Sequence, residues 1–325
     1  MNIIHWGIIG CGDVTEVKSG PAFNKVPNSA LVAVMRRNGE KAADYAKRHN
    51  VPRWYDDASQ LINDPGVNAI YIATPPDSHE AYTLAAIHAG KPVYVEKPMT
   101  LNYASAQRMA NAAAEKNVKL VVAHYRRKWP LFKKIKELIN EKMIGEPGLV
   151  YLQFCRPAMT KEELAVEKNA WRVNPAISGG GLFHDLAPHQ LDIMFWLFGP
   201  ATEINGRASN QNKVYAADDT VSGNIQFENG VDFKGNWNFN AAANKDRCEI
   251  IGSTGKLSFS FFSGNSIELV TNNQITRFDF DLLQHVQQPM IEKVVQYFRN
   301  EAGNPCTAEE GAEIMRWIGI CSNCT

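Results

Sequence analysis

The first 123 residues alternate short apolar runs with longer segments that have helical periodicity. Continuous apolar runs are typical of parallel strands that are buried on both faces, and each parallel pair needs a crossover connection, usually a helix. We therefore predict one parallel α/β domain over residues 1–123. Its strands are expected at Ile3–Ile9, Leu31–Met35, Ala69–Ala73, Val93–Val95 and Leu120–Ala123, with a further short run near Trp54. Its helices are expected at Val14–Asn24, Glu40–His49, Ser78–Ala89 and Asn102–Lys116.

The pattern changes after residue 123, so we predict a second domain over residues 124–325. It begins with a helix, Pro130–Met143, and a strand, Leu149–Phe154, and a polar loop then extends to Ser178.

Residues 201–282 are mainly strand-like stretches separated by turns rich in glycine and asparagine, which favours an antiparallel sheet. Two helices, Pro289–Arg299 and Ala308–Ile320, close the chain, and the last is expected to pack back on the first domain. An open sheet exposes an apolar face unless another subunit covers it. We therefore expect a homodimer or homotetramer that associates through this sheet.

The stretch WGIIGCGDVT contains three glycines, two of which, Gly10 and Gly12, follow the first predicted strand. Gly10 and Gly12 let the backbone approach a pyrophosphate closely, and the N-terminus of the next helix faces its negative charge. Thr15 stands where the usual G-x-G-x-x-G fingerprint has its third glycine, so the motif departs from that pattern. Between a strand and a helix, it predicts a dinucleotide site that includes Asp13 and Val14. A tight strand-to-helix turn is the alternative.

The predicted fold class is therefore α/β, with an N-terminal Rossmann dinucleotide-binding domain. The C-terminal domain is predicted to be α+β, with a large, mostly antiparallel open sheet.

The end of the second predicted strand indicates which dinucleotide is bound. A carboxylate at this place accepts hydrogen bonds from the ribose of NAD, whereas an arginine accommodates the 2′-phosphate of NADP. This chain has Arg36 and Arg37 there. Guanidinium groups bind phosphate bidentately, so we predict NADP as the cofactor. If both arginines are merely solvated, NAD remains the alternative.

Two further strands end in polar motifs, at the sheet edge where open α/β folds bind ligands. The first motif, IATPPDSH, places Thr74, Pro75 and His79 there, and we predict that they contact the cofactor. The second motif, VYVEKPMT, brings Glu96 and Lys97 to the same edge. A lysine there can hydrogen-bond a substrate hydroxyl or polarise a carbonyl group. Taken alone, Lys97 could equally be a surface lysine.

The segment GGGLFHDLAPHQLDIMFWLFG, residues 179–199, places Asp185 and His189 four residues apart. In a helix they share one face, which suits an acid/base pair. A metal site is the less favoured alternative, because His184 and Asp185 diverge around a helix and zinc needs a further ligand. Pro188 is expected to limit where the helix begins, because in an interior turn it loses a hydrogen bond. The glycines are expected to let the backbone pass close to the nicotinamide.

The chain resembles the glucose–fructose oxidoreductase, inositol dehydrogenase and rhizopine catabolism (Gfo/Idh/MocA) family. The resemblance lies in GIIGCGDVT, ATPPDSH, EKPMT and WRVNPAISGGGLFHDLAPHQLD, and it extends from residue 3 to about residue 320. It implies a nicotinamide-dependent oxidoreductase in which Lys97, Asp185 and His189 form the catalytic group. It also places Trp171 and Arg172 near the cofactor or substrate. In relatives a cis bond often precedes the proline that corresponds to Pro98, which would fix Lys97.

The chemistry of these residue types is coherent with that function. Removing hydride from a secondary alcohol requires its hydroxyl proton to leave, and a neutral imidazole such as His189 suits the base. Lys97, as an ammonium, can stabilise a developing alkoxide, and Asp185 can bind a sugar hydroxyl or orient His189. Tyr125 and Arg126, in the basic stretch HYRRKWPLFKKIKE, could border the substrate or belong to a solvated helix face.

The net charge argues against nucleic-acid and membrane partners, and the cysteines indicate the cellular compartment. Lys+Arg 34 and Asp+Glu 34 give a formal net charge of +0, which offers no electrostatic basis for binding nucleic acid or a membrane surface. No signal peptide or membrane span is recognisable, and the six scattered cysteines suit reduced thiols, so a cytoplasmic location is expected. The CSNC sequence near the C-terminus is interpreted as incidental, and no metal is predicted.

Two alternative functions remain. One is an enzyme that retains its cofactor and cleaves a glycosidic or other bond through transient oxidation. The other is a non-catalytic sensor in which the dinucleotide fold binds a ligand to control a partner. The presence of Lys97, Asp185 and His189 together favours an enzyme, because a sensor needs no proton relay.

Overall fold

The computed structural model describes residues 2–322, except for the side chains of residues 167 and 168, and it divides into two compact units. Unit 1 comprises Met1–Tyr125 and Leu283–Met315, and unit 2 comprises Arg126–Leu282 and Arg316–Thr325. The predicted second domain, residues 124–325, is therefore interrupted, because residues 283–315 belong to unit 1. Within unit 1 the Val122 amide donates to Cys306 O at 3.2 Å, and Phe298 packs 5.5 Å from Trp6 between ring centroids.

The described residues of unit 1 form a parallel six-stranded sheet in the order β3-β2-β1-β4-β5-β6. The chain thus changes direction across the sheet between β1 and β4, which is the doubly wound arrangement of a dinucleotide-binding fold. Every residue of the central strand β4 is buried, as expected for a strand covered on both faces. The strands are β1 Ile4–Ile9, β2 Ser29–Met35, β3 Arg53–Tyr55, β4 Ala69–Ile72, β5 Val93–Val95 and β6 Leu120–Val122.

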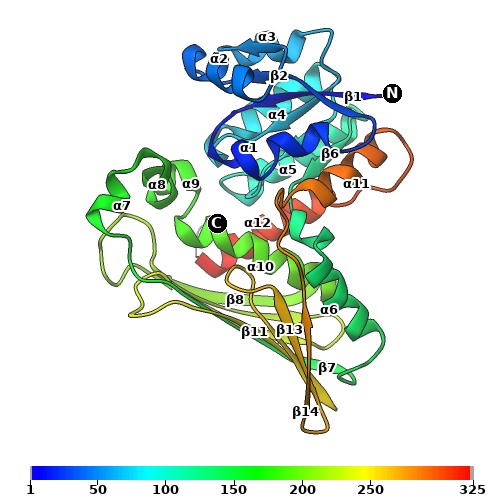
Figure 1. Ribbon diagram of the computed structural model, residues 1–325. Helices are drawn as coiled ribbons and strands as arrows, with labels where there is room; N and C mark the ends of the chain where they lie inside the picture. Colours follow the sequence, from blue (N-terminus) through cyan, green and yellow to red (C-terminus); the bar gives the residue numbers. More distant parts are fainter. Residues whose placement is uncertain (1, 323–325) are drawn as a thin grey trace. The chain divides into compact units, whose positions relative to one another are not determined.

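Helices accompany this sheet, in blue to cyan for the first part of the chain and in orange to red for the last (Figure 1). They are α1 Asp13–Val17, η1 Gly20–Asn24, α2 Gly39–Arg48, α3 Ala58–Asn63, η2 Pro76–Ser78, α4 His79–His88, α5 Tyr103–Glu115, α11 Gln288–Phe298 and the first part of α12 Ala308–Ser322. The helix predicted over residues 14–24 is wrong, because the chain instead forms two short helices. Pro21 cannot donate a helical hydrogen bond, and a Cβ on Gly20 would lie 2.2 Å from Thr15 O.

The described residues of unit 2 form an eight-stranded sheet in the order β14-β13-β12-β11-β7-β10-β9-β8 (Figure 1). All neighbouring pairs are antiparallel except β7 with β10, so the predicted fold class is confirmed. The expected meander is interrupted, however, because β7 lies between β10 and β11. The strands are β7 Pro147–Cys155, β8 Ala201–Ser209, β9 Thr220–Phe227, β10 Asp232–Asn238, β11 Lys245–Gly252, β12 Gly255–Phe259, β13 Ser266–Thr271 and β14 Gln274–Asp279.

Alternating residues give this sheet one apolar and one mainly polar face. The apolar face packs against α10, Leu182–Phe198: Trp237 Nε1 donates to Gln190 Oε1 at 2.6 Å, and Phe183 lies 5.0 Å from Trp237 between ring centroids. Burying one such large side chain contributes about 1.5–3 kcal/mol. The opposite face carries residues such as Lys234 and Glu249, with Tyr151 as its large exposed aromatic. The expectation of an apolar exposed face is therefore wrong.

The remaining segments of unit 2 are helical. They are α6 Pro130–Asn140, α7 Lys161–Ala165, α8 Glu167–Ala170, η4 Trp171–Val173 and α9 Pro175–Ser178, while η3 Tyr125–Lys128 begins at the last residue of the N-terminal part of unit 1. The polar loop predicted up to Ser178 thus contains short helices, one of which starts with a capping box at Thr160 and Glu163. Within residues 2–322, none of the helices combines the length and apolar character that a membrane span requires.

Candidate active site

The glycine turn after β1 has the geometry of a dinucleotide-binding loop. Gly10 has φ +96°, and a Cβ there would lie 2.7 Å from Thr74 Cγ2 and 2.8 Å from the Thr74 amide nitrogen. At Gly12, by contrast, a Cβ would meet nothing among the described residues closer than Gly10 O at 3.9 Å. The space beside Gly12 is thus open, as a site for a pyrophosphate requires. Asp13 and Val14 follow as the first residues of α1.

The two arginines lie at the end of β2, which neighbours β1. Arg36 Nη1 donates to Cys11 O at 3.5 Å, so the half-buried guanidinium extends back to the glycine turn. Arg37 is exposed. A positive group beside the glycine turn fits a phosphate-bearing nucleotide.

Thr74 and Pro75 follow β4 and are half-buried, and Thr74 lies next to Gly10 in the glycine turn. His79, the first residue of α4, is completely buried. Its Nε2 faces Thr74 O at 2.8 Å and its Nδ1 faces Pro98 O at 3.0 Å. Burial lowers the pKa of His79. His79 thus connects the segment after β4 with the segment after β5, and its predicted contact with the cofactor stays a prediction.

Glu96 and Lys97 follow β5, and the Lys97–Pro98 peptide bond is cis. The Lys97 backbone amide donates to Glu96 Oε2 at 3.1 Å, and the Lys97 side chain is half-buried. Glu96 Oε1 accepts hydrogen bonds from Tyr71 and Gln287, both fully buried. Sequence reasoning missed these two partners. Gln287 is 191 residues away from Glu96, and no local pattern connects them.

In unit 2, α10 carries the other predicted catalytic residues. Asp185 lies in the first turn of the helix and accepts a hydrogen bond from Arg172 Nε at 3.1 Å. The guanidinium of Arg172 also lies 4.5 Å from the centroid of the Trp171 ring. The structure thus brings Asp185, Arg172 and Trp171 together in one unit.

Pro188 lies inside α10, so the expectation that it limits the start of the helix is wrong. The helix begins instead at Leu182, after Gly181 with φ +82°. A Cβ on Gly181 would lie 2.3 Å from Ala217 Cβ, and one on Gly180 would lie 2.3 Å from the His184 ring. These glycines are therefore required by close packing within unit 2.

His189 lies one turn after Asp185 and is buried. Its ring meets the edge of the Phe262 ring, with centroids 5.7 Å apart. Arg126 is also buried and packs on the same ring: its guanidinium lies 4.6 Å from the Phe262 centroid and 4.3 Å from that of Trp129, and Nη1 donates to Phe261 O. Arg126 therefore belongs to the surroundings of His189 and not to a solvated helix face.

An ion pair between Arg127 and Asp192 fixes the same helix. Both side chains are almost fully buried, and Arg127 donates to Asp192 Oδ1 from Nη2 at 2.7 Å and from Nε at 3.0 Å. Because Asp192 lies three residues after His189, this pair anchors the helix that carries His189. The sequence had only shown Arg127 as one member of a basic run.

The structure offers no metal site among the described residues: His, Cys, Asp and Glu do not form a group of three or more that could hold an ion. His184 is buried, and its Nε2 pairs with Ser322 Oγ at 3.0 Å. The five described cysteines are buried, and none forms a disulfide with another described cysteine. Cys324, the second cysteine of CSNC, lies outside the described residues.

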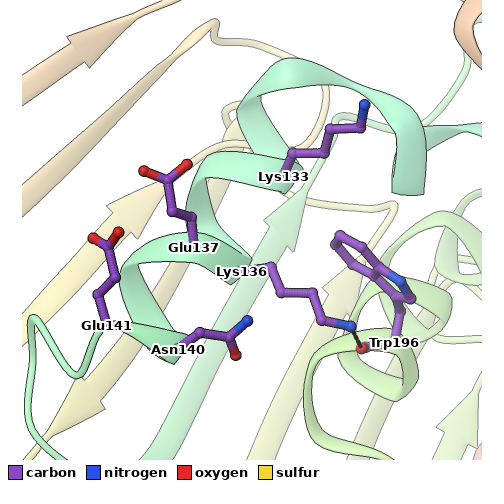
Figure 2. Close-up of a pocket in the computed structure, with 6 residues that line it drawn as sticks. All are labelled: Lys133, Lys136, Glu137, Asn140, Glu141 and Trp196. Atoms are coloured by element: carbon purple, nitrogen blue, oxygen red, sulfur yellow. Dashed lines mark hydrogen bonds between the residues drawn. The ribbon is translucent and has the colours of Figure 1, made fainter.

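A shallow pocket of about 380 Å³ lies elsewhere in unit 2, between α6 and the end of α10 (Figure 2). Lys136 crosses it, donating to Trp196 O at 2.9 Å with Nζ 4.2 Å from the centroid of the Trp196 ring. Its lining contains none of the predicted site residues. It is therefore separate from the candidate active site.

Comparison with protein-family models matches both parts of the chain. The model described as an oxidoreductase family with an NAD-binding Rossmann fold matches residues 4–124, and that of the GFO/IDH/MocA C-terminal domain matches residues 132–258.

Individual proteins are similar over most of the chain. An oxidoreductase of Formosa agariphila is 49% identical over 317 residues, which cover 98% of each chain. The trans-1,2-dihydrobenzene-1,2-diol dehydrogenase of Xenopus laevis is 26% identical over 88% of this chain and 83% of that one. A levoglucosan dehydrogenase solved with NADH and levoglucosan superposes with a TM-score of 0.87 at 20% identity, covering 98% of this chain and 96% of that one, which shows a shared fold.

Proposed function

We propose, from the premise that this chain belongs to the GFO/IDH/MocA family of NAD(P)-dependent oxidoreductases, that it interconverts a secondary alcohol and a ketone. The substrate is a sugar, a cyclitol or a related polyhydroxylated compound. The names of similar proteins, a diol dehydrogenase and a levoglucosan dehydrogenase, support this substrate class. When bound, the nicotinamide accepts or supplies the hydride.

Three residues of this chain act on the reacting alcohol and its neighbouring hydroxyl. The imidazole of His189 takes the hydroxyl proton of the alcohol, since a neutral imidazole is a suitable base near neutral pH. The ammonium group of Lys97 stabilises the developing alkoxide. Asp185 binds a neighbouring hydroxyl of the substrate and orients it.

One observation carries this proposal: α10 presents His189 and Asp185 one turn apart, and each is held by side chains of its own unit. Asp185 is paired with Arg172, and His189 packs against Phe262. The ion pair between Arg127, in η3, and Asp192, on α10, anchors the helix that carries Asp185 and His189. Catalytic side chains need this kind of support to keep a productive geometry.

The cofactor proposed is NADP, with NAD as the alternative. Gly10 and Gly12 hold the pyrophosphate, while Arg36 and Arg37 bind the 2′-phosphate. The contact of Arg36 with Cys11 O supports this, because it holds a guanidinium beside the glycine turn.

The test is a screen of polyols and ketoses with NADP(H) and NAD(H), following absorbance of the reduced nicotinamide. Once a substrate is found, Lys97→Met and His189→Asn are each expected to lower kcat by about 100-fold or more, the usual contribution of acid/base groups. Exposed residues of the same types provide the controls, Lys47→Met and His88→Asn.

Normal turnover by both catalytic variants would refute the assignment of residues. Turnover without net consumption of the dinucleotide, by protein that retains its cofactor through purification, would instead favour bond cleavage through transient oxidation. Specific sugar binding with no turnover under any condition would favour a sensor.

We also propose that two copies associate through the polar face of the eight-stranded sheet. Lys234 and Glu249 both neighbour the exposed Tyr151 on this face, so a two-fold axis can bring opposite charges together. Light scattering at micromolar concentration tests this, with Tyr151→Asp expected to yield monomers. A monomeric wild-type protein would contradict it.

A further inference from the structure

A half-buried arginine packs near the same ring, Phe262, as His189, and it was not singled out by its sequence context. Arg156 follows β7, and its guanidinium lies 5.0 Å from the centroid of the Phe154 ring and 5.7 Å from that of Phe262. Within the described part of the chain, this guanidinium makes no hydrogen bond or ion pair with the protein. Its donors are thus available to another group.

The backbone around Arg156 is held firmly. Its amide donates to Asn238 O at 2.8 Å, and its carbonyl oxygen accepts from the Ala241 amide at 3.0 Å. These bonds connect the end of β7 to the end of β10 and the turn that follows. The position of the side chain is therefore set by regular structure.

Hydrogen bonds also fix the backbone around Phe262. Asp246 accepts hydrogen bonds from the backbone amides of Phe261, Phe262 and Ser263 at 3.0, 2.6 and 2.8 Å. One carboxylate thus fixes the loop after β12. The position of the Phe262 ring, on which Arg156 and His189 both pack, is therefore well fixed.

Phe262 connects Arg156 to His189. The His189 ring centroid and the Arg156 Cζ atom each lie 5.7 Å from the same ring centroid, so they are separated by no more than twice that distance. A hydrogen bond at each end takes about 2.9 Å of this separation. At its upper limit, the remaining span accommodates one sugar ring.

Guanidinium groups bind carboxylate and phosphate groups bidentately, and a partly desolvated guanidinium does so more strongly than one in water. Arg126 also packs on Phe262, which adds positive charge to the same place. A neutral polyol would leave the Arg156 guanidinium without a counter-ion among the described residues. An anionic substrate would supply it.

We infer that Arg156 binds an anionic group of the substrate, so that the substrate is an acidic sugar derivative whose reacting hydroxyl lies at His189. This inference rests on the proposed function, because it takes His189 as the reacting end. It makes Arg156 a residue that determines specificity.

The experiment compares matched acidic and neutral sugars as substrates with NADP and NAD. The pairs are D-glucuronate with D-glucose and D-galacturonate with D-galactose, and glucose 6-phosphate distinguishes a phosphate from a carboxylate. Wild-type protein is expected to prefer one acidic compound over its neutral partner in kcat/KM. Arg156→Gln is expected to lower that preference by about 10- to 100-fold through KM, and Arg156→Lys to retain part of it. Arg207→Gln, an exposed arginine on β8, is the matched control.

Turnover of neutral sugars with no preference for acids would overturn the inference and leave the proposed function intact. An acid preference that Arg156→Gln does not change would overturn it as well. If no compound is turned over, binding of D-glucuronate and D-glucose is measured by tryptophan fluorescence. Binding of the acid alone, lost in Arg156→Gln, supports the inference although the redox function fails, and equal binding or none overturns it.

Discussion

Tyr71 donates its hydroxyl hydrogen to Glu96 Oε1 at 2.5 Å, in a place where both side chains are buried. Burial and the charge of Glu96 raise the pKa of Tyr71 well above its ordinary value, so the hydroxyl remains a donor. Gln287 donates to the same oxygen and accepts from the Tyr94 hydroxyl at 3.0 Å. The other oxygen of Glu96 accepts from the Lys97 amide, so this network supports the backbone of a proposed catalytic residue.

Gln287→Ala is expected to destabilise the protein by about 1–3 kcal/mol, because it leaves the buried Glu96 and Tyr94 each short of a partner. Glu292→Ala, at an exposed position on the same helix, serves as the control and is expected to change stability by no more than about 0.5 kcal/mol. Urea unfolding measures both. Equal stability of the two variants would show that the network contributes nothing.

The two glycines of the turn after β1 should respond differently to alanine. Gly10→Ala places a Cβ within 2.8 Å of the Thr74 backbone at a positive φ, so it should destabilise the protein without any ligand. Gly12→Ala meets no such contact among residues 2–322, and its φ of −127° is open to alanine. Gly12→Ala should therefore keep its melting temperature but lose dinucleotide affinity. Full affinity in a Gly12→Ala variant, titrated by nicotinamide fluorescence, would refute pyrophosphate binding at this turn.

His184 should make stability depend on pH. Burial lowers its pKa to about 4 from the ordinary 6.5. Because the unfolded chain binds this proton near pH 6.5 and the folded chain only near pH 4, its contribution is complete above pH 6.5 and is lost as the pH falls to 4. The loss is on the order of 3 kcal/mol at most.

Unfolding free energies of wild type and His184→Gln at pH values from 7 to 4.5 check this. Their difference should shrink as the pH falls, while His88→Gln, at an exposed position, should follow wild type. A difference that does not change with pH would mean that His184 carries the same proton in both states.

The elements of the Rossmann domain were predictable because each is encoded locally. The apolar runs of β1, β4 and β5 are continuous, and the glycine turn follows a strand directly. The location of β7 in the middle of the second sheet was not predictable, because its pairing with β10 joins segments about 80 residues apart. The return of residues 283–315 to unit 1 depends on similar long-range contacts.

The candidate site also combines residues that could be predicted from local sequence with residues that depend on long-range contacts. Asp185 and His189 could be singled out because their spacing matches a helical turn. Phe262 and Arg156 could not, since each is an ordinary residue in its own segment and acquires significance only beside His189. Pro188 misled the prediction of the helix boundary, because the helix continues despite the hydrogen bond that proline cannot make.

The last prediction concerns the choice of cofactor. Arg36 lies beside the glycine turn, and Arg37 is the next residue in the sequence. NADPH should therefore bind about 10- to 100-fold more tightly than NADH, as expected for charge-assisted hydrogen bonds to a phosphate. Arg36→Glu should reverse the order, since a carboxylate repels the 2′-phosphate and accepts hydrogen bonds from the ribose. Lys47→Gln, at an exposed position, should change neither affinity. Fluorescence titrations at low and high salt measure these affinities, and the advantage of NADPH should decrease with salt because the interaction is electrostatic. Equal affinities of the wild-type protein for the two dinucleotides would leave the arginines without this role.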